Sequence, residues 1–439
     1  MNKEKTAQWM AILSLFLIPF NIKKFITLLI GNGEYFPLEL SSAFLYLSEI
    51  FSIFFILFVI ITKRKEFLLL CRLLWPLFLL LGISIISIAI SDSLLLSIVS
   101  CVHLFFITLF TVAVATVIHS QILSVRDAMK VFAISALLQA EIAILQFVNQ
   151  GSIGLHFFGE ETINALTQGV AKIEVFGSIF IRSYGTFPHP NILGGFLVLG
   201  VIAWIYLFSS PSKRHGVFHR STSLIGLFVV LLGLVFSFSR SAWIAAIVSF
   251  ILCIIILFSK KEYSSVAREL VLSGMIFGAI LLGMVGWALV SRGTIKNDSA
   301  INERKVYTYI AVDMMGEYPF GVGIGNGIVR AEQEGRYDAY GLASKATHQP
   351  VHNIYLLIAE ELGIVGVIVF LFFVGNLFVI KKQKTHLIDV SFLLVMFVSF
   401  LFIGLFDHYL LTLNAGRLMF FSILGIIAGL SLKTEKEPL

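Results

Sequence analysis

Long apolar runs separated by short polar segments recur along the whole 439-residue chain. A helix needs about 20 apolar residues to cross the hydrocarbon core of a bilayer, and windows of that size predict twelve spanning helices. Their ranges are 8–30, 37–61, 67–90, 93–118, 129–149, 190–209, 222–238, 241–258, 269–290, 353–380, 388–406 and 413–432. We therefore predict an all-α polytopic membrane protein, with residues 1–439 forming one integral membrane domain.

The distribution of Lys and Arg predicts the orientation of these spans. Nineteen of the 32 Lys and Arg residues fall on the side that carries both termini, against eleven on the other side, with Lys23 and Lys24 unassigned. Short cytoplasmic loops are enriched in Lys and Arg. The clusters at 63–65, 213–214, 260–261 and 381–384 each follow an even-numbered span. Both termini are therefore predicted to be cytoplasmic.

Two long segments then face outward, at 150–189 and 291–352. The second lies between spans nine and ten and is too long for a simple connector. Within it, residues 301–316 predict a short helix, and the glycine-rich stretch 321–327 predicts a sharp turn near the membrane surface. This stretch matches no phosphate-binding loop, because no Gly-Lys-Ser/Thr follows it.

Composition excludes several classes of protein. Hydrophobic residues make up 58% of the chain and charged residues 13%, whereas a soluble domain is about 45–50% apolar and about 25% charged. A soluble enzyme, a disordered chain and a nucleic-acid-binding protein are thereby excluded. Cys71, Cys101 and Cys253 form no Cys-x-x-Cys pair, so neither a zinc site nor a redox motif is expected. The first apolar run lacks a cleavage site and is predicted to be retained.

The predicted topology brings polar residues from distant stretches to the outer face. Arg182 precedes span six, Arg240 lies at the turn between spans seven and eight, Arg304 lies in the large loop, and His352 opens span ten. An arginine at a helix end can also extend to lipid phosphates. For Arg240 and Arg304 we favour a role in a site. Further candidates on this face are Asn353, Arg292, Asp407 and His408, and for Arg292 the lipid contact is the favoured interpretation.

Several other ionisable residues lie in or beside the spans. Glu49 and Glu141 fall inside predicted spans, the latter between Gln139 and Gln146. Intramembrane ionisable groups usually face a cavity or a partner, so Glu141 is kept as a lower-priority site candidate. The pair Glu360 and Glu361 is predicted to hydrogen-bond between helices. His189 is predicted to be structural and His348 to lie on the loop surface.

Four motifs in this order resemble the O-antigen ligase and polymerase superfamily. They are RSYGTFPHPNILGG at 182–195, FSFSRSAW at 236–243, ERKVYTYIAVDMMGEYPFGVGIGNG at 303–327 and HNIYLLIAEELGIVG at 352–366. The resemblance covers roughly residues 180–430. It implies a membrane-type glycosyltransferase with about twelve spans and a large outer, periplasmic loop between spans nine and ten, in the bacterial inner (plasma) membrane.

The resemblance also implies a reaction. Family members transfer a preassembled glycan from undecaprenyl pyrophosphate to an acceptor hydroxyl, which belongs to lipid A–core in ligases and to another lipid-linked glycan in polymerases. Arg182, Arg240 and Arg304 correspond to the family's arginines and His352 to its histidine, with Asn353 beside it. Arg292 matches no family motif. Membrane lipids and the two lipid-linked substrates are the partners implied, and no nucleic acid.

The chemistry of these side chains suits that reaction. Arginine binds phosphate oxygens bidentately and stabilises the charge of a departing pyrophosphate. A neutral histidine at the water boundary can accept the proton of the acceptor hydroxyl, and nearby arginines should lower its pKa. Direct attack would invert the anomeric carbon. Because no Asp-x-Asp or paired outer carboxylates occur, we predict a metal-independent reaction without a cofactor.

Three alternatives remain open at this point. The motifs do not separate an O-antigen ligase from an O-antigen or capsule polymerase. A twelve-span transporter or flippase would need polar residues near the midplane and broken helices, for which Glu49 and Glu141 give some support. A sugar O-acyltransferase would be expected to place its histidine toward a cytoplasmic acyl donor, whereas His352 is predicted to face outward.

Overall fold

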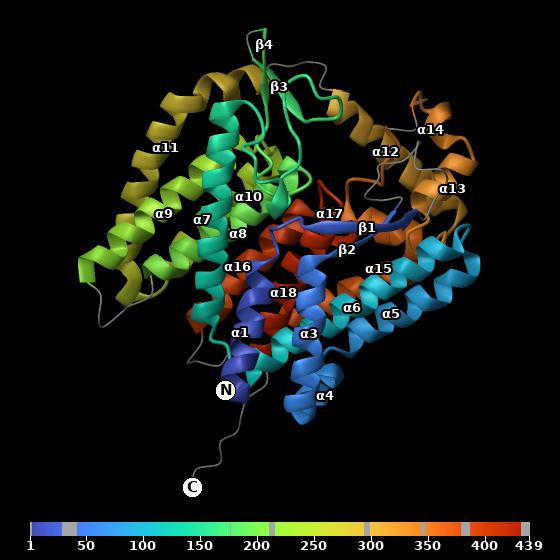
Figure 1. The fold of residues 1–439 in the computed structure, drawn as a ribbon, viewed down its shortest axis with the longest axis horizontal. Helices are drawn as coiled ribbons and strands as arrows, with labels where there is room; N and C mark the ends of the chain where they lie inside the picture. The colour runs from blue at the N-terminus through green and yellow to red at the C-terminus, as the bar shows by residue number, and fades with distance from the viewer. Residues whose placement is uncertain are drawn as a thin grey trace.

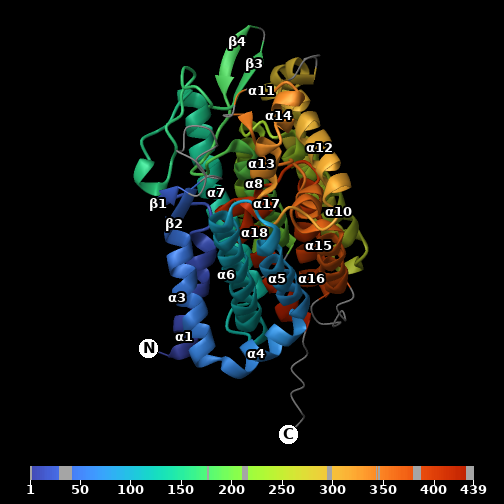
Figure 2. The same cartoon turned by 90° about the vertical axis from the view of Figure 1, so that its right-hand side faces the viewer.

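The computed structural model describes residues 2–28, 42–175, 177–209, 216–293, 299–342, 344, 347–378 and 387–431. Helices dominate it, and most run roughly along one direction in a bundle (Figures 1 and 2). Two short antiparallel ribbons and a group of short helices lie toward one end of that bundle. The predicted all-α character is confirmed apart from these ribbons, of which β1 (Lys23–Leu28) pairs with β2 (Ser42–Tyr46) and β3 (Lys172–Val175) with β4 (Ser178–Ile181).

The helices follow the apolar runs of the sequence closely. In chain order they are α1 (Lys3–Phe16), α3 (Leu47–Thr62), α4 (Arg64–Leu73), α5 (Trp75–Ser87), α6 (Leu94–His119), α7 (Val125–Asn149), α8 (Pro190–Ser209), α9 (Gly216–Phe236), α10 (Arg240–Phe258), α11 (Ser264–Gly293), α12 (Ser299–Glu317), α13 (Gly327–Gln333), α14 (Arg336–Ala339), α15 (Ile354–Phe378), α16 (Leu387–Ile403), α17 (Tyr409–Thr412) and α18 (Asn414–Ser431). Three short 3-10 turns complete them, η1 (Ile88–Ile90), η2 (His156–Phe158) and η3 (Lys261–Tyr263).

Among the described residues, six helices are long and apolar enough to cross a membrane: α6, α7, α8, α10, α11 and α15. The pair α4 and α5 adds a seventh if it counts as one bent span. Four shorter apolar helices, α3, α9, α16 and α18, occupy the positions of four further predicted spans. The chain is thus a multi-pass membrane protein, and from the fourth predicted span onward each apolar run is a separate helix.

The first predicted span is wrong as a continuous helix. Helix α1 ends at Phe16, and the chain then continues into the strand β1. Proline has no backbone N–H to donate and clashes with the preceding helical turn, so Pro19 opposes continuation of α1. Lys23 on β1 instead pairs with Glu161 of the first long loop, with 3.2 Å between Nζ and Oε1. The predicted second span is also shortened. Residues 42–46 form β2, the partner strand of β1, so the helix α3 begins only at Leu47.

The third predicted span is broken rather than straight. Helices α4 and α5 are bent by 71° at Leu74, and Pro76 lies in the first turn of α5. Proline suits the first turn of a helix but opposes helical geometry in the residue before it. The apolar run at 67–90 therefore forms two helices, with α4 lying across the same end of the bundle as the start of α1 (Figure 2).

Helix α8 forms the centre of the bundle. All of its residues are buried, and it packs against α7, α9, α10 and α16. Because α8 begins at Pro190, its first turn carries Asn191 into the interior of the protein. The position of α8 therefore fixes one wall of the site described below.

The large loop between α11 and α15 is built on a glycine-rich turn, as predicted. Gly321 packs against a kink in α15 at Gly363, and both glycines have positive φ angles, of 83° and 67°. A Cβ at Gly321 would lie 2.4 Å from the Glu361 carbonyl oxygen, and one at Gly363 would lie 2.5 Å from that of Pro319. Only glycine accepts both the conformation and this approach. The predicted helix at 301–316 is confirmed as α12.

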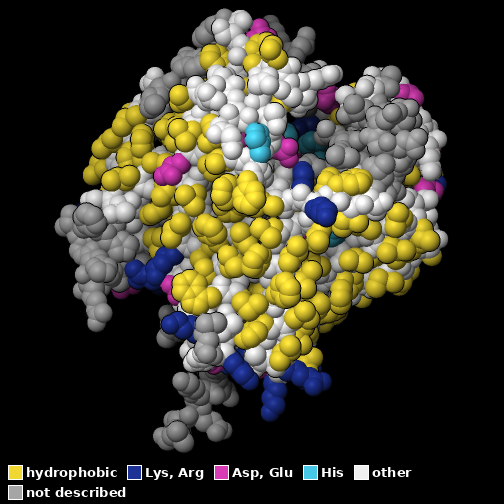
Figure 3. Space-filling view, viewed as in Figure 1, with side chains coloured by type: hydrophobic (Ala, Val, Ile, Leu, Met, Phe, Trp, Pro, Cys, Tyr) yellow, Lys and Arg dark blue, Asp and Glu magenta, His cyan; other side chains and the backbone are white. Residues whose placement is uncertain are grey.

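The surface supports a membrane orientation. Figure 3 shows apolar side chains covering the middle of one face, over α1, α3, α7 and α9, with Lys and Arg gathered along its lower edge. The start of α1 and the end of α18 lie at that same end (Figures 1 and 2). Both of these helix ends thus lie at the end where Lys and Arg gather, and their cytoplasmic position stays a prediction.

We predict that Lys65 and Lys261 face the cytoplasm and that Ser152 and Asp338 face outward. Single cysteines at these four positions should react differently with a membrane-impermeant maleimide added to intact spheroplasts, with labelling at 152 and 338 alone. Labelling after membrane disruption at all four positions is the control. Protection of position 338 in intact spheroplasts would contradict the orientation.

Candidate active site

The structure brings Arg240, Arg304 and His352 to one cleft of about 580 Å³. They come from the start of α10, from α12 and from the residues just before α15. A second cavity, of about 130 Å³, is lined by His352 together with Asn191, Asp407 and His408. His352 thus lies between a wide cleft and a narrow polar cavity. The predicted convergence of distant stretches holds for these residues.

One face of α12 lines the wide cleft. It carries Ile301, Arg304, Lys305, Thr308 and Tyr309, at the i, i+3, i+4, i+7 and i+8 positions that share one side of a helix. The opposite face carries buried residues that pack within the large loop. The sequence analysis did not single out Lys305. Its position beside Arg304, four residues after Ile301, places it on the same helical face and is the signal that would have identified it.

The rim of this cleft is apolar and exposed. Ile244, Leu405 and Phe406 line it with exposed fractions of 48%, 46% and 42%. These exposed apolar side chains lie beside the cations Arg240, Arg304 and Lys305, so the surface is both hydrophobic and positively charged. Such a surface matches an anionic group attached to a hydrocarbon chain better than it matches a free ion.

Asp407 connects the elements around the site. Its Oδ2 accepts a hydrogen bond from Asn191 Nδ2 at 2.7 Å and lies 3.6 Å from a terminal nitrogen of Arg304. Its Oδ1 accepts from the backbone N–H of His408 at 2.9 Å. The carboxylate is buried, and a buried charge is tolerated when it is both paired and hydrogen-bonded. Asp407 thereby joins α8, α12 and the segment after α16.

Arg182 lies behind the site and lines neither cavity. Its terminal guanidinium nitrogen donates to Asn191 Oδ1 at 2.6 Å and its Nε to the Ser237 carbonyl at 2.9 Å. Because Asn191 in turn donates to Asp407, Arg182 orients the amide that holds the carboxylate. The family's first arginine is therefore placed to position the site rather than to reach into the cleft.

Two glutamines of α7 hold the loop that leads to Asn191. Gln146 Oε1 accepts from the N–H groups of Tyr184 and Gly185, at 3.0 and 2.8 Å. About two helical turns earlier on the same face of α7, Gln139 Oε1 accepts from Thr186 N–H at 2.9 Å. Both glutamines are buried. These two amides of α7 therefore have a structural role, and their seven-residue spacing places them on the same side of the helix.

The geometry of His352 defines its tautomer. Its Nδ1 lies 3.2 Å from the Pro350 carbonyl oxygen, which can only accept a hydrogen bond, so Nδ1 carries the proton. The ring stacks on Tyr307 with centroids 5.5 Å apart and meets His408 edge-on at 4.8 Å. Nε2 is consequently left with a lone pair and is the nitrogen able to accept a proton.

The pKa of His352 is lowered to about 3, chiefly by burial and then by the neighbouring His408, Arg304 and His189, against the opposing charge of Asp407. The predicted direction is confirmed, but burial rather than the arginines is the largest cause. The pKa of His408 is lowered in the same way. Burial would raise the pKa of Asp407, but His352, Arg304 and His408 hold it below the ordinary value. At pH 7 the histidines are neutral and the carboxylate is charged.

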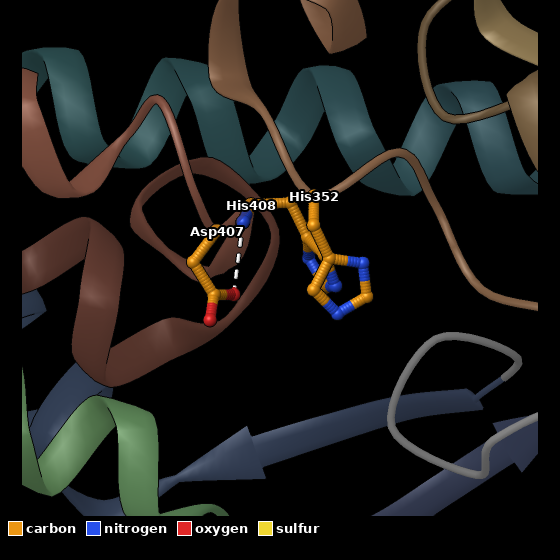
Figure 4. Close-up of side chains that lie close together, drawn as sticks. All are labelled: His352, Asp407 and His408. Carbon is orange, nitrogen blue, oxygen red and sulfur yellow. Dashed lines mark hydrogen bonds between the residues drawn. The ribbon is translucent and has the colours of Figure 1, made fainter. Parts of the chain in front are cut away.

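His352, Asp407 and His408 lie side by side (Figure 4), with one nitrogen or oxygen of each within 4.8 Å of the others. Two imidazoles and a carboxylate are possible zinc ligands. However, His408 Nδ1 bonds to Thr412 at 2.7 Å, His352 Nδ1 faces a carbonyl, and Asp407 Oδ2 already has Asn191 and Arg304 as partners. The two Nε2 atoms and Asp407 Oδ1 are then the atoms left to face a cation, and the charge of the carboxylate is already paired with Arg304. The reaction proposed below assigns no role to a metal.

The other sequence-predicted residues lie outside the cavities. Asn353 caps α15, because its Oδ1 accepts from the N–H groups of Tyr355 and Leu356. Glu141 is exposed on α7, which gives no support to a transporter pathway through it. Arg292 falls in the last turn of α11, and its side chain lies outside the described residues.

Two predictions about histidines have different outcomes. His189 is structural as predicted, since its buried Nδ1 accepts from the backbone N–H of Asn191 at 3.2 Å. The prediction that His348 lies on the loop surface is wrong. His348 is 1% exposed, because it stacks on Tyr337 and bonds to the Leu342 carbonyl within the folded outer loop.

Residues 225–371 match the family described as O-antigen ligase. The chain is similar to the O-antigen ligase family over this segment, which makes up about a third of its 439 residues. The matched segment runs from α9 into α15 and contains Arg240, Arg304 and His352, the three sequence-predicted residues that meet in the wide cleft. Comparison with curated proteins gives no match to the chain.

Similarity to the O-antigen ligase family supports a broad functional assignment. Proteins of this family are ligases or polymerases of lipid-linked glycans, which are glycosyltransferase-like enzymes of bacterial membranes. The segment outside the match supplies Arg182, Asn191 and Asp407. The family region therefore provides the charged cleft, while the two flanking regions provide the polar network that holds it.

We predict that acidification destabilises the protein through the buried histidines. Their folded pKa values lie below the ordinary value of about 6.5, so the unfolded chain binds more protons below that pH. Unfolding is then favoured as the pH falls from 6.5 toward the folded value of about 3 given for His189 and His352. The apparent melting temperature in detergent should decrease over the interval from pH 7 to 4.

Two variants test this assignment. His189→Gln keeps an acceptor for Asn191 but cannot take a proton, so the slope of melting temperature against pH should become shallower. His119→Gln, at the end of α6, is the matched control and should leave the slope unchanged. An equal slope in wild type and His189→Gln would contradict this source of acid sensitivity.

Proposed function

We propose that this protein is an inverting glycosyltransferase of the outer face of the bacterial inner membrane. Its donor is a preassembled glycan on undecaprenyl pyrophosphate, and its acceptor is a hydroxyl group. The observation that carries the proposal is the wide cleft, where Arg240, Arg304 and Lys305 lie beside an exposed apolar rim. A lipid-linked pyrophosphate presents the complementary charge and hydrocarbon chain.

The cations of the cleft bind the leaving group. Negative charge on the pyrophosphate grows as the bond from the anomeric carbon to its phosphate oxygen breaks. Arginine remains charged and offers a planar pair of donors to phosphate oxygens, so Arg240 and Arg304 stabilise the departing anion. Lys305 adds a point charge on the same helical face. This cationic set supplies the electrostatic stabilisation without requiring a metal ion or cofactor.

His352 acts as the general base. The acceptor oxygen attacks the anomeric carbon from the side opposite the pyrophosphate and gives its proton to Nε2 of His352. The new carbon–oxygen bond forms while the old one breaks, and the electron pair leaves with the pyrophosphate. Configuration at the carbon is inverted. A half-buried, neutral imidazole with a proton already on Nδ1 is suited to this single transfer.

Asp407 is a positioning residue in this scheme. Its charge pairs with Arg304 and holds that side chain at the cleft while balancing the positive charge that His352 gains. Asn191 and Arg182 keep the carboxylate in place from behind. General-base catalysis gains from such support because the imidazolium form is briefly populated beside a fixed negative charge.

The acceptor decides between two functions of the same family. Lipid A–core oligosaccharide as acceptor makes the protein an O-antigen ligase, which we place first. A second lipid-linked repeat as acceptor makes it an O-antigen or capsule polymerase. Deletion of the gene separates them: loss of all O-chains with accumulation of lipid-linked polymer indicates a ligase, whereas capping by single repeats indicates a polymerase.

The two cleft arginines should not be replaceable by lysine. Arg240→Lys and Arg304→Lys retain charge but lose the planar fork, so turnover should fall by about ten- to a hundredfold, as expected for loss of a charge-assisted hydrogen bond. The measurement is transfer by purified protein reconstituted with lipid-linked donor and acceptor. Arg220→Lys, at an exposed pair with Glu269, is the matched control. Full activity in both cleft variants would mean that charge alone suffices.

Removal of the base should reduce turnover without loss of donor binding. His352→Ala is expected to lower kcat by about 10²–10⁴-fold, the usual worth of general-base catalysis, while the Kd for donor changes little. Because the pKa of His352 lies near 3, the free enzyme should keep kcat/KM level from pH 8 to 5 and lose it only at lower pH. Transfer within a fewfold of wild type in His352→Ala would place the base elsewhere, with His408 as the next candidate.

A further inference from the structure

A third cavity, of about 180 Å³, lies among α5, α6, α15 and α18. Its walls are mostly hydrocarbon, contributed by residues such as Leu80, Leu104, Ile107, Phe370 and Phe421. An engineered cavity of about 150 Å³ with similar walls stays dry and accepts a benzene ring. This cavity therefore has room for a short length of hydrocarbon chain.

Arg417 lines this apolar cavity. It lies in the first turn of α18, three residues after Asn414. Across the described residues, its guanidinium has no hydrogen bond and no ion pair within 4.0 Å. The acidic side chain that interacts with it through space is Glu49, which instead accepts from Tyr46 N–H at 3.3 Å and lies 3.8 Å from His103.

Arg417, whose guanidinium donors have no protein partner among the described residues, is suited to bind an anionic group in this cavity. Guanidinium has five N–H donors and never loses its charge, and a charged group inside a membrane protein usually pairs with a partner or marks a substrate pathway. Glu49 balances part of the positive charge of Arg417 through space, but it accepts no hydrogen bond from the guanidinium. The cavity therefore combines mostly apolar walls with the free N–H donors of Arg417, and this combination suits an amphiphilic ligand.

The position of the cavity along the bundle fits a lipid. Arg417 lies about 5 Å along α18 from its first residue, given a rise of 1.5 Å per residue. That end of α18 is the end toward which the candidate active site faces, because Leu413 lines both this cavity and the small one beside His408. A phosphate at Arg417 would lie near the outer boundary of the hydrocarbon, and its chain would extend inward along α6 and α15.

We propose that this cavity is a second lipid site, which binds a lipid-borne phosphate through Arg417 and holds part of the hydrocarbon chain among α5, α6, α15 and α18. It is distinct from the wide cleft, whose cations are Arg240, Arg304 and Lys305. The proposal does not depend on the glycosyl-transfer reaction, because Arg417 and the apolar side chains of this cavity are not among the proposed reacting groups.

Two kinds of lipid carry the required phosphate: a glycerophospholipid such as phosphatidylglycerol, and a polyprenyl phosphate. The experiment uses the purified full-length Arg304→Gln protein, so that the wide cleft contributes little. Delipidated protein in detergent is titrated with phosphatidylglycerol, undecaprenyl monophosphate, phosphatidylcholine and inorganic phosphate, and Kd is measured by microscale thermophoresis.

Three further variants, each added to Arg304→Gln, test the two halves of the site. Arg417→Gln should weaken binding of the preferred lipid phosphate by about ten- to a hundredfold, as for loss of charge-assisted hydrogen bonds. Leu104→Trp, which fills the cavity, should weaken it by at least tenfold while Arg417 is retained. Arg220→Gln is the matched arginine control and should stay within twofold. Melting temperatures within a few degrees of the parent protein confirm folding.

Tight binding of either lipid phosphate, lost in both Arg417→Gln and Leu104→Trp, supports the site, and the tighter lipid identifies the occupant. Equal affinity for phosphatidylcholine or for inorganic phosphate would overturn it, as would unchanged binding in Arg417→Gln. Failure here leaves the transfer reaction untouched, because that reaction is assayed with the Arg304 side chain intact and through different residues.

Discussion

The contact between the buried carboxylate of Asp407 and the guanidinium of Arg304 is the interaction on which the site depends. It joins the segment after α16 to α12 of the large loop, and through Asn191 it reaches the start of the central helix α8. A buried charge without partners would be costly. Three parts of the chain around the site are thus held relative to one another by one carboxylate.

The same carboxylate sets the electrostatics of the histidines. Burial and the surrounding cations keep His352 neutral and its Nε2 open, while Asp407 limits the rise in positive charge when a proton arrives. A base with a low pKa is a weaker proton acceptor but is fully in its active form at pH 7. In the proposed reaction the nearby pyrophosphate adds negative charge at the moment of transfer, which strengthens the base when it is needed.

Two of the cavities combine charge with apolar walls in different ways. The wide cleft combines cations with an exposed apolar rim, while the cavity among α5, α6, α15 and α18 combines hydrocarbon walls with Arg417. Each arrangement suits a molecule with a charged head and an apolar chain. The glycine turn against the kink of α15 fixes the backbone beside the Arg417 cavity, where Ile324, Gly325 and Glu361 form part of the wall.

The sequence by itself determined the membrane class, most helix positions and the residue types of the site. Apolar length and Lys/Arg distribution report directly on transfer to a bilayer, which is a local property of each segment. The predicted topology placed Arg240, Arg304 and His352 on one face, and the family motifs singled them out as site residues. The sequence could not show that residues 23–28 form a strand, since that depends on pairing with residues 42–46 and on Glu161.

Tertiary structure decided which polar residues share a cavity and which are structural supports. Arg182 and Arg240 look equivalent in sequence, yet packing of α8 turns Arg182 toward Asn191 and leaves Arg240 at the cleft. Glu141 is exposed on α7, while Gln139 and Gln146 face inward. Hydrogen-bond partners are set by side chains that lie tens or hundreds of residues apart, so their identity follows from the three-dimensional packing and from no local pattern.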